Sequence, residues 1–106
     1  MAEGPAKTGV VVPFGLSRSV AQELIRKLRA EGAFSLEPKA RMNVSERKFT
    51  MRQVLTTLAE GTINQGPTRD ECNDWRCRLK KRVAGRLVHV VIAIHDMRFL
   101  YVISVH

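Results

Sequence analysis

Residues 75–106 read WRCRLKKRVAGRLVHVVIAIHDMRFLYVISVH, and this stretch decides the fold. Over residues 75–83, apolar side chains alternate with cations, and Lys81 is the one break on the apolar side. Alternation with a period of two is typical of a strand that is buried on one face. Residues 87–94 are almost wholly apolar and β-branched, as in a central strand, and residues 99–105 predict a last strand. The stretch therefore predicts an antiparallel meander.

The lengths of the two turns predict which side chains share a face. We take Ala84-Gly85 as a two-residue hairpin loop and residues 95–98 as a four-residue loop. Lys80 then lies opposite His89, His89 opposite Ser104, and Leu87 opposite His106. The core face holds the cross-strand sets Trp75/Ile94/Phe99, Cys77/Ile92/Tyr101 and Leu79/Val90/Ile103. Because its three aromatic residues are predicted to be in the core, we do not expect them to stack on nucleic-acid bases.

The opposite face carries a basic stripe, which consists of Arg76, Arg78, Lys80 and Arg82, with His89, Ser104 and His106 beside it. Residues two apart on a strand are separated by about 6.8 Å, which is comparable to successive phosphates of an extended nucleic-acid strand. A three-residue loop with Gly85 in the left-handed position would shift the pairing and place His89 in the core. The sequence leaves this alternative open.

Apolar residues also fall on the basic face, namely Val91, Ala93, Leu100 and Val102. Exposed apolar patches of this kind are usually covered by another segment or chain, so we expect part of this face to be covered. The candidates are residues 10–14, a second copy of the chain in a homodimer, or a partner chain.

The residues before the meander predict helices that cover its core face, which gives an α+β fold. Residues 1–16 are predicted to be a flexible N-terminal segment, and residues 17–106 a single domain. A helix from Ser17 or Ser19 to Glu31 carries an apolar stripe of Val20, Ala21, Leu24, Ile25 and Leu28, and Gly32 suits its end.

A second helix is expected over residues 51–60, because Thr50 and Gln53 have the spacing of a capping box. Between these two helices, residues 33–36 are a candidate extended segment and residues 39–48 a candidate short helix. Residues 62–65 predict a short strand, and residues 66–73 predict a loop by their composition.

Composition narrows the class of protein. A chain of 106 residues leaves no room for a second independent core, and a hydrophobic fraction of 44% argues against disorder. No apolar run approaches the roughly 18 residues that span a bilayer. Two cysteines, Cys72 and Cys77, cannot build a disulfide framework or a zinc site, so we expect a cytoplasmic protein without a metal or cofactor. The net charge of +8 favours a polyanion or an acidic protein as partner.

An ordered set of short matches runs through the chain. It consists of Pro38-Lys39-Ala40-Arg41, Val44-Ser45-Glu46-Arg47, Phe49-Thr50, Val54-Leu55, Leu58, Gly61, Ile63, Gly66-Pro67, Trp75-Arg76-Cys77, Gly85 and Val102-Ile103-Ser104-Val105. In this pattern the chain resembles a bacterial domain family of unknown function that has been grouped, by fold inference, with the RelE/ParE-like toxins and related ribonucleases. The family has a His-Ala-x-x-Arg-Met-x-x-Arg core. Ala40 and Arg47 match it, whereas Lys39, Asn43 and Val44 stand in place of its His, first Arg and Met.

This resemblance implies a RelE-like fold, in which helices cover one side of an antiparallel sheet and the basic other side faces RNA. It also implies an acidic, antitoxin-like partner and a role as a ribonuclease toxin. It places Arg41 and Arg47 at the edge of the binding groove.

The candidate binding residues are thus Arg41, Arg47 and the basic stripe, with RNA as the expected ligand. The candidate catalytic residues are His89, Lys80, Arg78 and His106, because a histidine can take the proton of a ribose 2′-hydroxyl while cations stabilise charge on the phosphate. The alternatives are a buried structural His89 and a non-catalytic module that binds an acidic protein through the same face.

Overall fold

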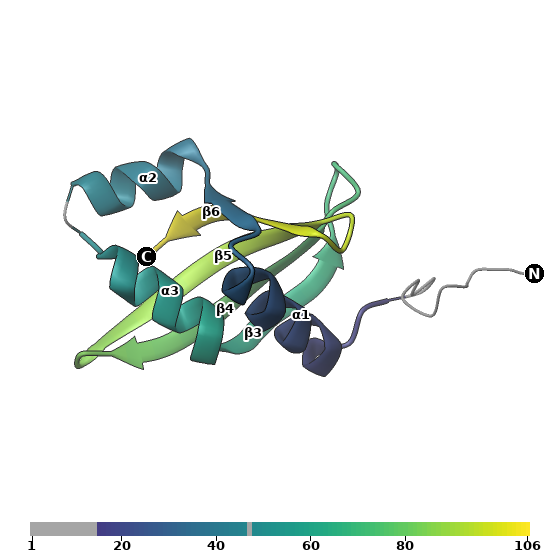
Figure 1. The fold of residues 1–106 in the computed structure, drawn as a ribbon, viewed down its shortest axis with the longest axis horizontal. Helices are drawn as coiled ribbons and strands as arrows, with labels where there is room; N and C mark the ends of the chain where they lie inside the picture. The colour runs from purple at the N-terminus through teal and green to yellow at the C-terminus, as the bar shows by residue number, and fades with distance from the viewer. Residues whose placement is uncertain (1–14, 47) are drawn as a thin grey trace, which may run out of the picture.

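The computed structural model describes residues 15–46 and 48–106. Its elements follow the chain in the order α1 (Arg18–Ala30), β2 (Phe34–Leu36), α2 (Pro38–Ser45), α3 (Met51–Glu60), β3 (Thr62–Arg69), β4 (Trp75–Val83), β5 (Arg86–His95) and β6 (Phe99–Val105). The strands form one five-stranded sheet in the order β2-β6-β5-β4-β3 (Figure 1). The predicted α+β class is confirmed. The expected flexible segment over residues 1–16 falls mainly outside the described residues, and Leu16 packs into the core.

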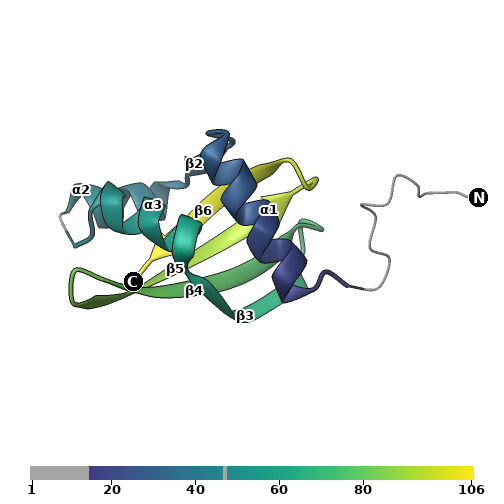
Figure 2. The same cartoon turned by 60° about the horizontal axis from the view of Figure 1, so that its bottom comes forward.

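The helices lie together on one face of the sheet (Figures 1 and 2). Ser17 caps helix α1, because its hydroxyl accepts a hydrogen bond from the Val20 backbone N–H, so the helix starts at the first of the two predicted positions. Helix α3 has the predicted capping box, in which Thr50 and Gln53 each bond the other's backbone N–H. Val20, predicted on the apolar stripe, is 47% exposed because it lies at the rim of that stripe.

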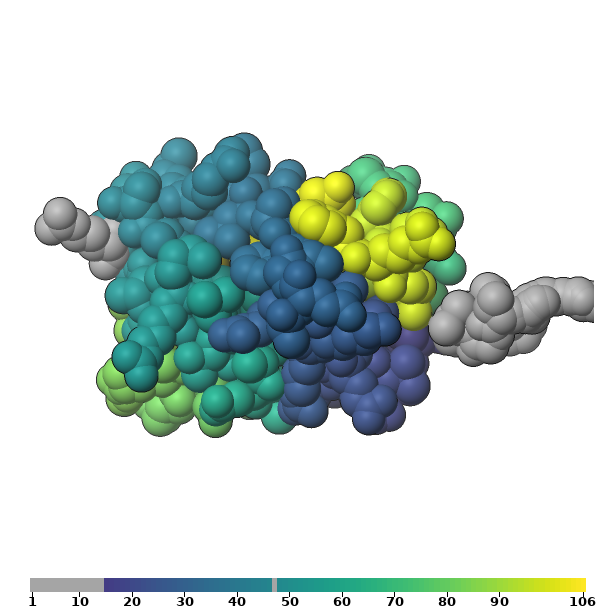
Figure 3. All heavy atoms as spheres, in the orientation of Figure 1, coloured from purple at the N-terminus to yellow at the C-terminus, as the bar shows by residue number. Residues whose placement is uncertain are grey.

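The core lies between the helices and the sheet. It contains Ala21, Ile25 and Leu28 of α1, Val54 and Leu58 of α3, and Trp75, Cys77, Leu79, Val88, Val90, Ile92, Ile94, Leu100, Val102 and Val105 of the sheet. The space-filling view from the helix side shows that the helices hide most of the sheet, and the yellow C-terminal strand region is seen only at the upper right (Figure 3).

The edge strand β2 makes the sheet mixed, whereas an antiparallel sheet was predicted. β2 runs parallel to β6, with Phe34 opposite Leu100 and Leu36 opposite Val102. Helix α2 follows β2 and packs its Ala40 into the core, so the chain returns to the helix-covered face of the sheet before α3 begins. Strand β2 has only three residues, and its apolar and polar side chains do not form an alternating pattern long enough to predict a parallel pairing with β6.

The β4–β5 hairpin has the predicted register. Ala84 and Gly85 have φ angles of 53° and 79°, so both residues of the loop adopt the left-handed region that a two-residue turn of this kind requires. Val83 lies opposite Arg86, and Lys80 opposite His89. The three-residue alternative, which would have turned His89 into the core, is therefore wrong.

The β5–β6 hairpin differs from its predicted register by one residue. The loop contains only residues 96–98, and Asp96 and Met97 have φ angles of 53° and 56°. Ile94 consequently lies opposite Leu100, where Phe99 was predicted. A shift of one residue exchanges the faces of a strand, so Leu100 and Val102 are in the core, and Phe99, Tyr101 and Ile103 are not.

A β-bulge follows in the same strand. The register shifts between Ile92–Val102 and Val91–Ser104, which leaves Ile103 as an extra residue in β6. As a result, Val91 lies opposite Ser104, and the backbones of His89 and His106 exchange hydrogen bonds of 2.7 and 2.9 Å. The predicted pairs His89–Ser104 and Leu87–His106 are therefore wrong.

Strand β3 is longer than predicted. It continues through residues 66–69, which were expected to belong to a loop. Two register shifts interrupt the pairing of β3 with β4. The apolar and polar residues of β3 therefore do not alternate regularly, and its composition is that of a loop. Gly66 has a φ of 83°, and a Cβ at this position would stand 2.5 Å from the Arg76 carbonyl oxygen, so the close approach of β3 to β4 requires glycine.

Candidate nucleic-acid interface

The basic stripe lies on the sheet face that no helix of the described residues covers. Its members alternate along β4 with Trp75, Cys77 and Leu79, which are buried beneath the helices. Arg76, Lys80 and Arg82 are exposed, and Arg78 is partly buried. A β-strand spaces these cations by about 6.8 Å and aims them all at the same side. The sequence predicted this arrangement correctly.

Neighbouring groups hold three of the four cations in place. The Arg78 Nε donates to Asn64 Oδ1 on β3 at 3.2 Å, and an Arg82 amino group donates to the Gly85 carbonyl at 3.2 Å. The Arg76 Nε lies 3.5 Å from a carboxylate oxygen of Asp70. Lys80 makes no hydrogen bond or ion pair with another described residue, so its ammonium is available to a ligand.

Asp70 is an anion built into the loop before β4. Its Oδ1 accepts hydrogen bonds from the backbone N–H groups of Asp74, at 3.0 Å, and Cys72, at 2.9 Å. The bond from Asp74 is the largest cause that lowers the pKa of Asp70, and the positive charge of Arg76 adds to it. Asp70 therefore stays ionised and offsets part of the charge of Arg76.

The stripe continues sideways into a histidine pair. Lys80 lies opposite His89, and His89 lies opposite His106, so the three side chains form one row across β4, β5 and β6. The two imidazole rings have their centroids 5.3 Å apart. The structure thus brings His106 closer to His89 than the sequence predicted, because of the bulge at Ile103.

The environment of His89 favours its neutral form. Partial burial is the largest cause that lowers the pKa of His89 below its usual value of 6.5. The positive charges of Arg78, His106 and Lys80 lower it further. A neutral imidazole beside cations can accept a proton at neutral pH.

An aromatic cluster that the sequence did not predict lies at the other end of the same face. It consists of His95 at the end of β5 and Phe99 and Tyr101 at the start of β6. Phe99 and Tyr101 are partly exposed here because of the one-residue register difference, so the expectation that they are core residues was wrong. His95 was assigned to a turn, and only its short distance to Asp74 in the folded chain marks it as notable.

The two remaining candidate residues do not join this face. Arg41 lies on α2, which packs through Ala40 into the core on the helix side. It is therefore separated from the basic stripe by the sheet itself. Arg47 lies outside the described residues, as do residues 10–14, which were considered as a cover for the basic face.

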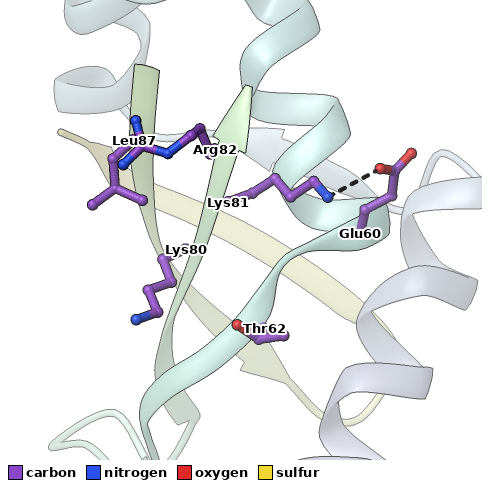
Figure 4. Close-up of a pocket in the computed structure, with 6 residues that line it drawn as sticks. All are labelled: Glu60, Thr62, Lys80, Lys81, Arg82 and Leu87. Carbon is purple, nitrogen blue, oxygen red and sulfur yellow. Dashed lines mark ion pairs between the residues drawn. The ribbon is translucent and has the colours of Figure 1, made fainter. Parts of the chain in front are cut away.

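A shallow hollow of about 260 Å³ borders the stripe where β3 begins. Figure 4 shows Lys80, Arg82 and Leu87 on one side of β4, with Lys81 directed the other way, toward Glu60. The Lys81 Nζ lies 3.6 Å from a Glu60 carboxylate oxygen, which explains the one cation on the apolar side of β4. Thr62 completes the lining. The hollow is thus a cationic pocket at the end of the stripe.

Other candidate chemistry is limited in the described parts of the chain. Cys72 is exposed, whereas Cys77 is buried, and burial raises the pKa of the Cys77 thiol to about 12. Within residues 15–46 and 48–106, no three His, Cys, Asp or Glu side chains are grouped to hold a metal ion. None of the described helices has the length and apolar character to cross a membrane.

The fold and this face define the class of protein: a small basic α+β domain with helices on one face of its sheet and cations on the other. The chain belongs to the family described as "Domain of unknown function (DUF4258)", whose model matches residues 34–106. The match begins at β2, so α1 precedes the matched region. Comparisons with curated proteins and with solved structures gave no match.

Proposed function

We propose that this protein binds RNA through the uncovered face of its sheet. The observation that carries the proposal is the basic stripe, which directs four cations to one side of β4 at regular spacing. Polar faces of sheets usually mix charged and neutral residues, and an unbroken series of cations fits a repeating anion. Such contacts with phosphates give affinity without sequence preference.

The resemblance to RelE/ParE-like toxins extends this proposal to RNA cleavage. His89 takes the proton of a ribose 2′-hydroxyl, the 2′-oxygen bonds to phosphorus, and the bond from phosphorus to the 5′-oxygen breaks. The leaving oxygen takes a proton from the His106 imidazolium, and the products are a 2′,3′-cyclic phosphate and a 5′-hydroxyl end. Lys80 and Arg78 stabilise the charge that develops on the phosphate.

The lowered pKa of His89, the short distance between the two rings and the adjacent Lys80 support this assignment. The two free thiols fit a cytoplasmic protein, where thiols stay reduced. An acidic, antitoxin-like protein would bind the same face and block it, because it offers the same charge as RNA.

Binding is tested with two probes, a single-stranded RNA oligomer and polyglutamate of similar length, by fluorescence anisotropy. The variant Arg78→Ala/Lys80→Ala should lose most of its RNA affinity. The control Lys39→Ala/Arg52→Ala removes the same charge from exposed positions on the helix side and should leave the affinity nearly unchanged. If both double variants lost the same RNA affinity, the loss would be explained by net charge alone, and the basic stripe would have no special role. Binding of polyglutamate alone would support a module for an acidic protein.

Cleavage is tested separately on a 2′-deoxy oligonucleotide that carries a single ribonucleotide, so that only one 2′-hydroxyl is present. The wild-type protein should cut after that ribonucleotide and leave a cyclic phosphate, and His89→Ala should not cut. Because the backbone of His89 makes the bonds to His106, the variant should keep its circular dichroism spectrum. A folded His89→Ala variant that cuts at the wild-type rate would exclude His89 as the base and leave RNA binding as the function.

A further inference from the structure

The aromatic cluster beyond the basic stripe has the geometry of a stacking surface. The centroids of Phe99 and Tyr101 lie 5.2 Å apart with an angle of 59° between the rings. Those of His95 and Tyr101 lie 6.0 Å apart at 62°. The three rings therefore form one connected patch at the end of β5 and β6.

A carboxylate fixes one member of the patch. The Nδ1 of His95 lies 2.8 Å from Oδ1 of Asp74. The Asp74 side chain is only 12% exposed, whereas the His95 side chain is 55% exposed. The buried partner thus holds an exposed ring in one orientation, and the Nε2 edge of that ring remains for a ligand. A ring held in this way loses little conformational entropy when a ligand binds.

The patch is continuous with the basic stripe. Arg76 lies opposite Ala93, and Ala93 lies opposite Tyr101, so a single cross-strand row joins the first cation to the aromatic cluster. Ala93 is 2% exposed and small, which keeps the surface between the two side chains flat. Two strand spacings separate the backbones of Arg76 and Tyr101, about 10 Å.

We propose that His95, Phe99 and Tyr101 stack on the bases of a single-stranded RNA whose phosphates contact the basic stripe. This inference rests on the proposed RNA binding and specifies its substrate. Proteins that bind single strands combine a cationic track for the backbone with aromatic rings for the bases. In a duplex the bases stack on one another and offer no free faces, so the platform selects single strands.

The test compares a single-stranded RNA oligomer with a duplex of the same sequence. The variants are Phe99→Leu and Tyr101→Leu, which keep an apolar side chain in the strand and remove the ring. Phe34→Leu is the matched control, because Phe34 lies on β2 opposite Leu100 and packs on the helix side of the sheet. Circular dichroism verifies the fold of each variant.

We expect Tyr101→Leu to lose about tenfold in affinity for the single strand and to bind the duplex as the wild type does, since stacking on one base accounts for a factor of this size. The salt dependence should not change, because no phosphate contact is removed. If the wild type binds RNA through the basic stripe but Tyr101→Leu and Phe99→Leu behave like Phe34→Leu, the platform is refuted and the proposed function stands. If the wild type binds no RNA, the proposed function itself fails.

Discussion

The number of phosphates that the basic stripe contacts can be counted from the salt dependence of RNA binding. Each phosphate contact to a single strand contributes about −0.7 to the slope of log affinity against log salt concentration. Four cations, each on one phosphate, therefore contribute about −2.8, and a rise from 50 to 200 mM salt lowers affinity about fiftyfold. Removal of two contacts in Arg78→Ala/Lys80→Ala leaves about −1.4, and the same rise then lowers affinity only about sevenfold.

The assay is a series of fluorescence anisotropy titrations with a single-stranded RNA at four or more salt concentrations. The control Lys39→Ala/Arg52→Ala carries the same net charge as the double variant, so it removes the contribution of overall charge. A double variant with the wild-type slope would show that Arg78 and Lys80 do not contact phosphates. A slope that falls equally in the control would show that the directed geometry of β4 has no part in binding.

Three further predictions concern stability and reactivity. Ala84→Gly should raise the free energy of unfolding by about 0.5–1 kcal/mol in urea titrations, because Ala84 has a positive φ that glycine adopts without strain; an unchanged midpoint would contradict this. His89 has a lower pKa in the folded state than in the unfolded state, so its contribution to stability is complete above about pH 6.5 and is lost as the pH falls below that value. The wild type should therefore lose more stability between pH 7 and pH 5 than His89→Gln, and parallel stability curves would refute this. Iodoacetamide at pH 8 should modify exposed Cys72 and spare buried Cys77 until denaturant is added, and mass spectrometry of peptides would detect modification of both in the native protein.

The part of the fold that could be predicted is the part in which local patterns are strong. Alternation along residues 75–83 indicated both faces of β4, and the capping box placed α3 to the residue. The turn at Ala84-Gly85 then aligned Lys80 with His89. Each of these features is determined by a short segment of the chain, so it could be predicted without knowledge of contacts between distant residues.

The other parts depend on contacts that short segments do not encode. Strand β5 is apolar on both faces, so its composition could not select among registers with β6, and the loop length was overestimated by one residue. This error placed Phe99 and Tyr101 in the core and hid the aromatic patch. The parallel pairing of β2 and the pairing of Asp74 with His95 join residues far apart in the chain, and no sequence pattern marks either of them.

The bulge at Ile103 also determines where this chain tolerates a change in length. If β6 kept all its residues but had no bulge, the pairing that joins Ile94 to Leu100 would continue unbroken, and His106 would lie opposite Val88 on the core face. Deletion of Ile103 should therefore remove the bulge and keep His106 opposite His89, whereas insertion of one more residue into β6 after Leu100 would place His106 opposite Val88 and turn its imidazole toward the core. Insertions in the loop over residues 70–74 leave the strand registers intact, so we expect insertions in related chains to gather there and to be rare in β6.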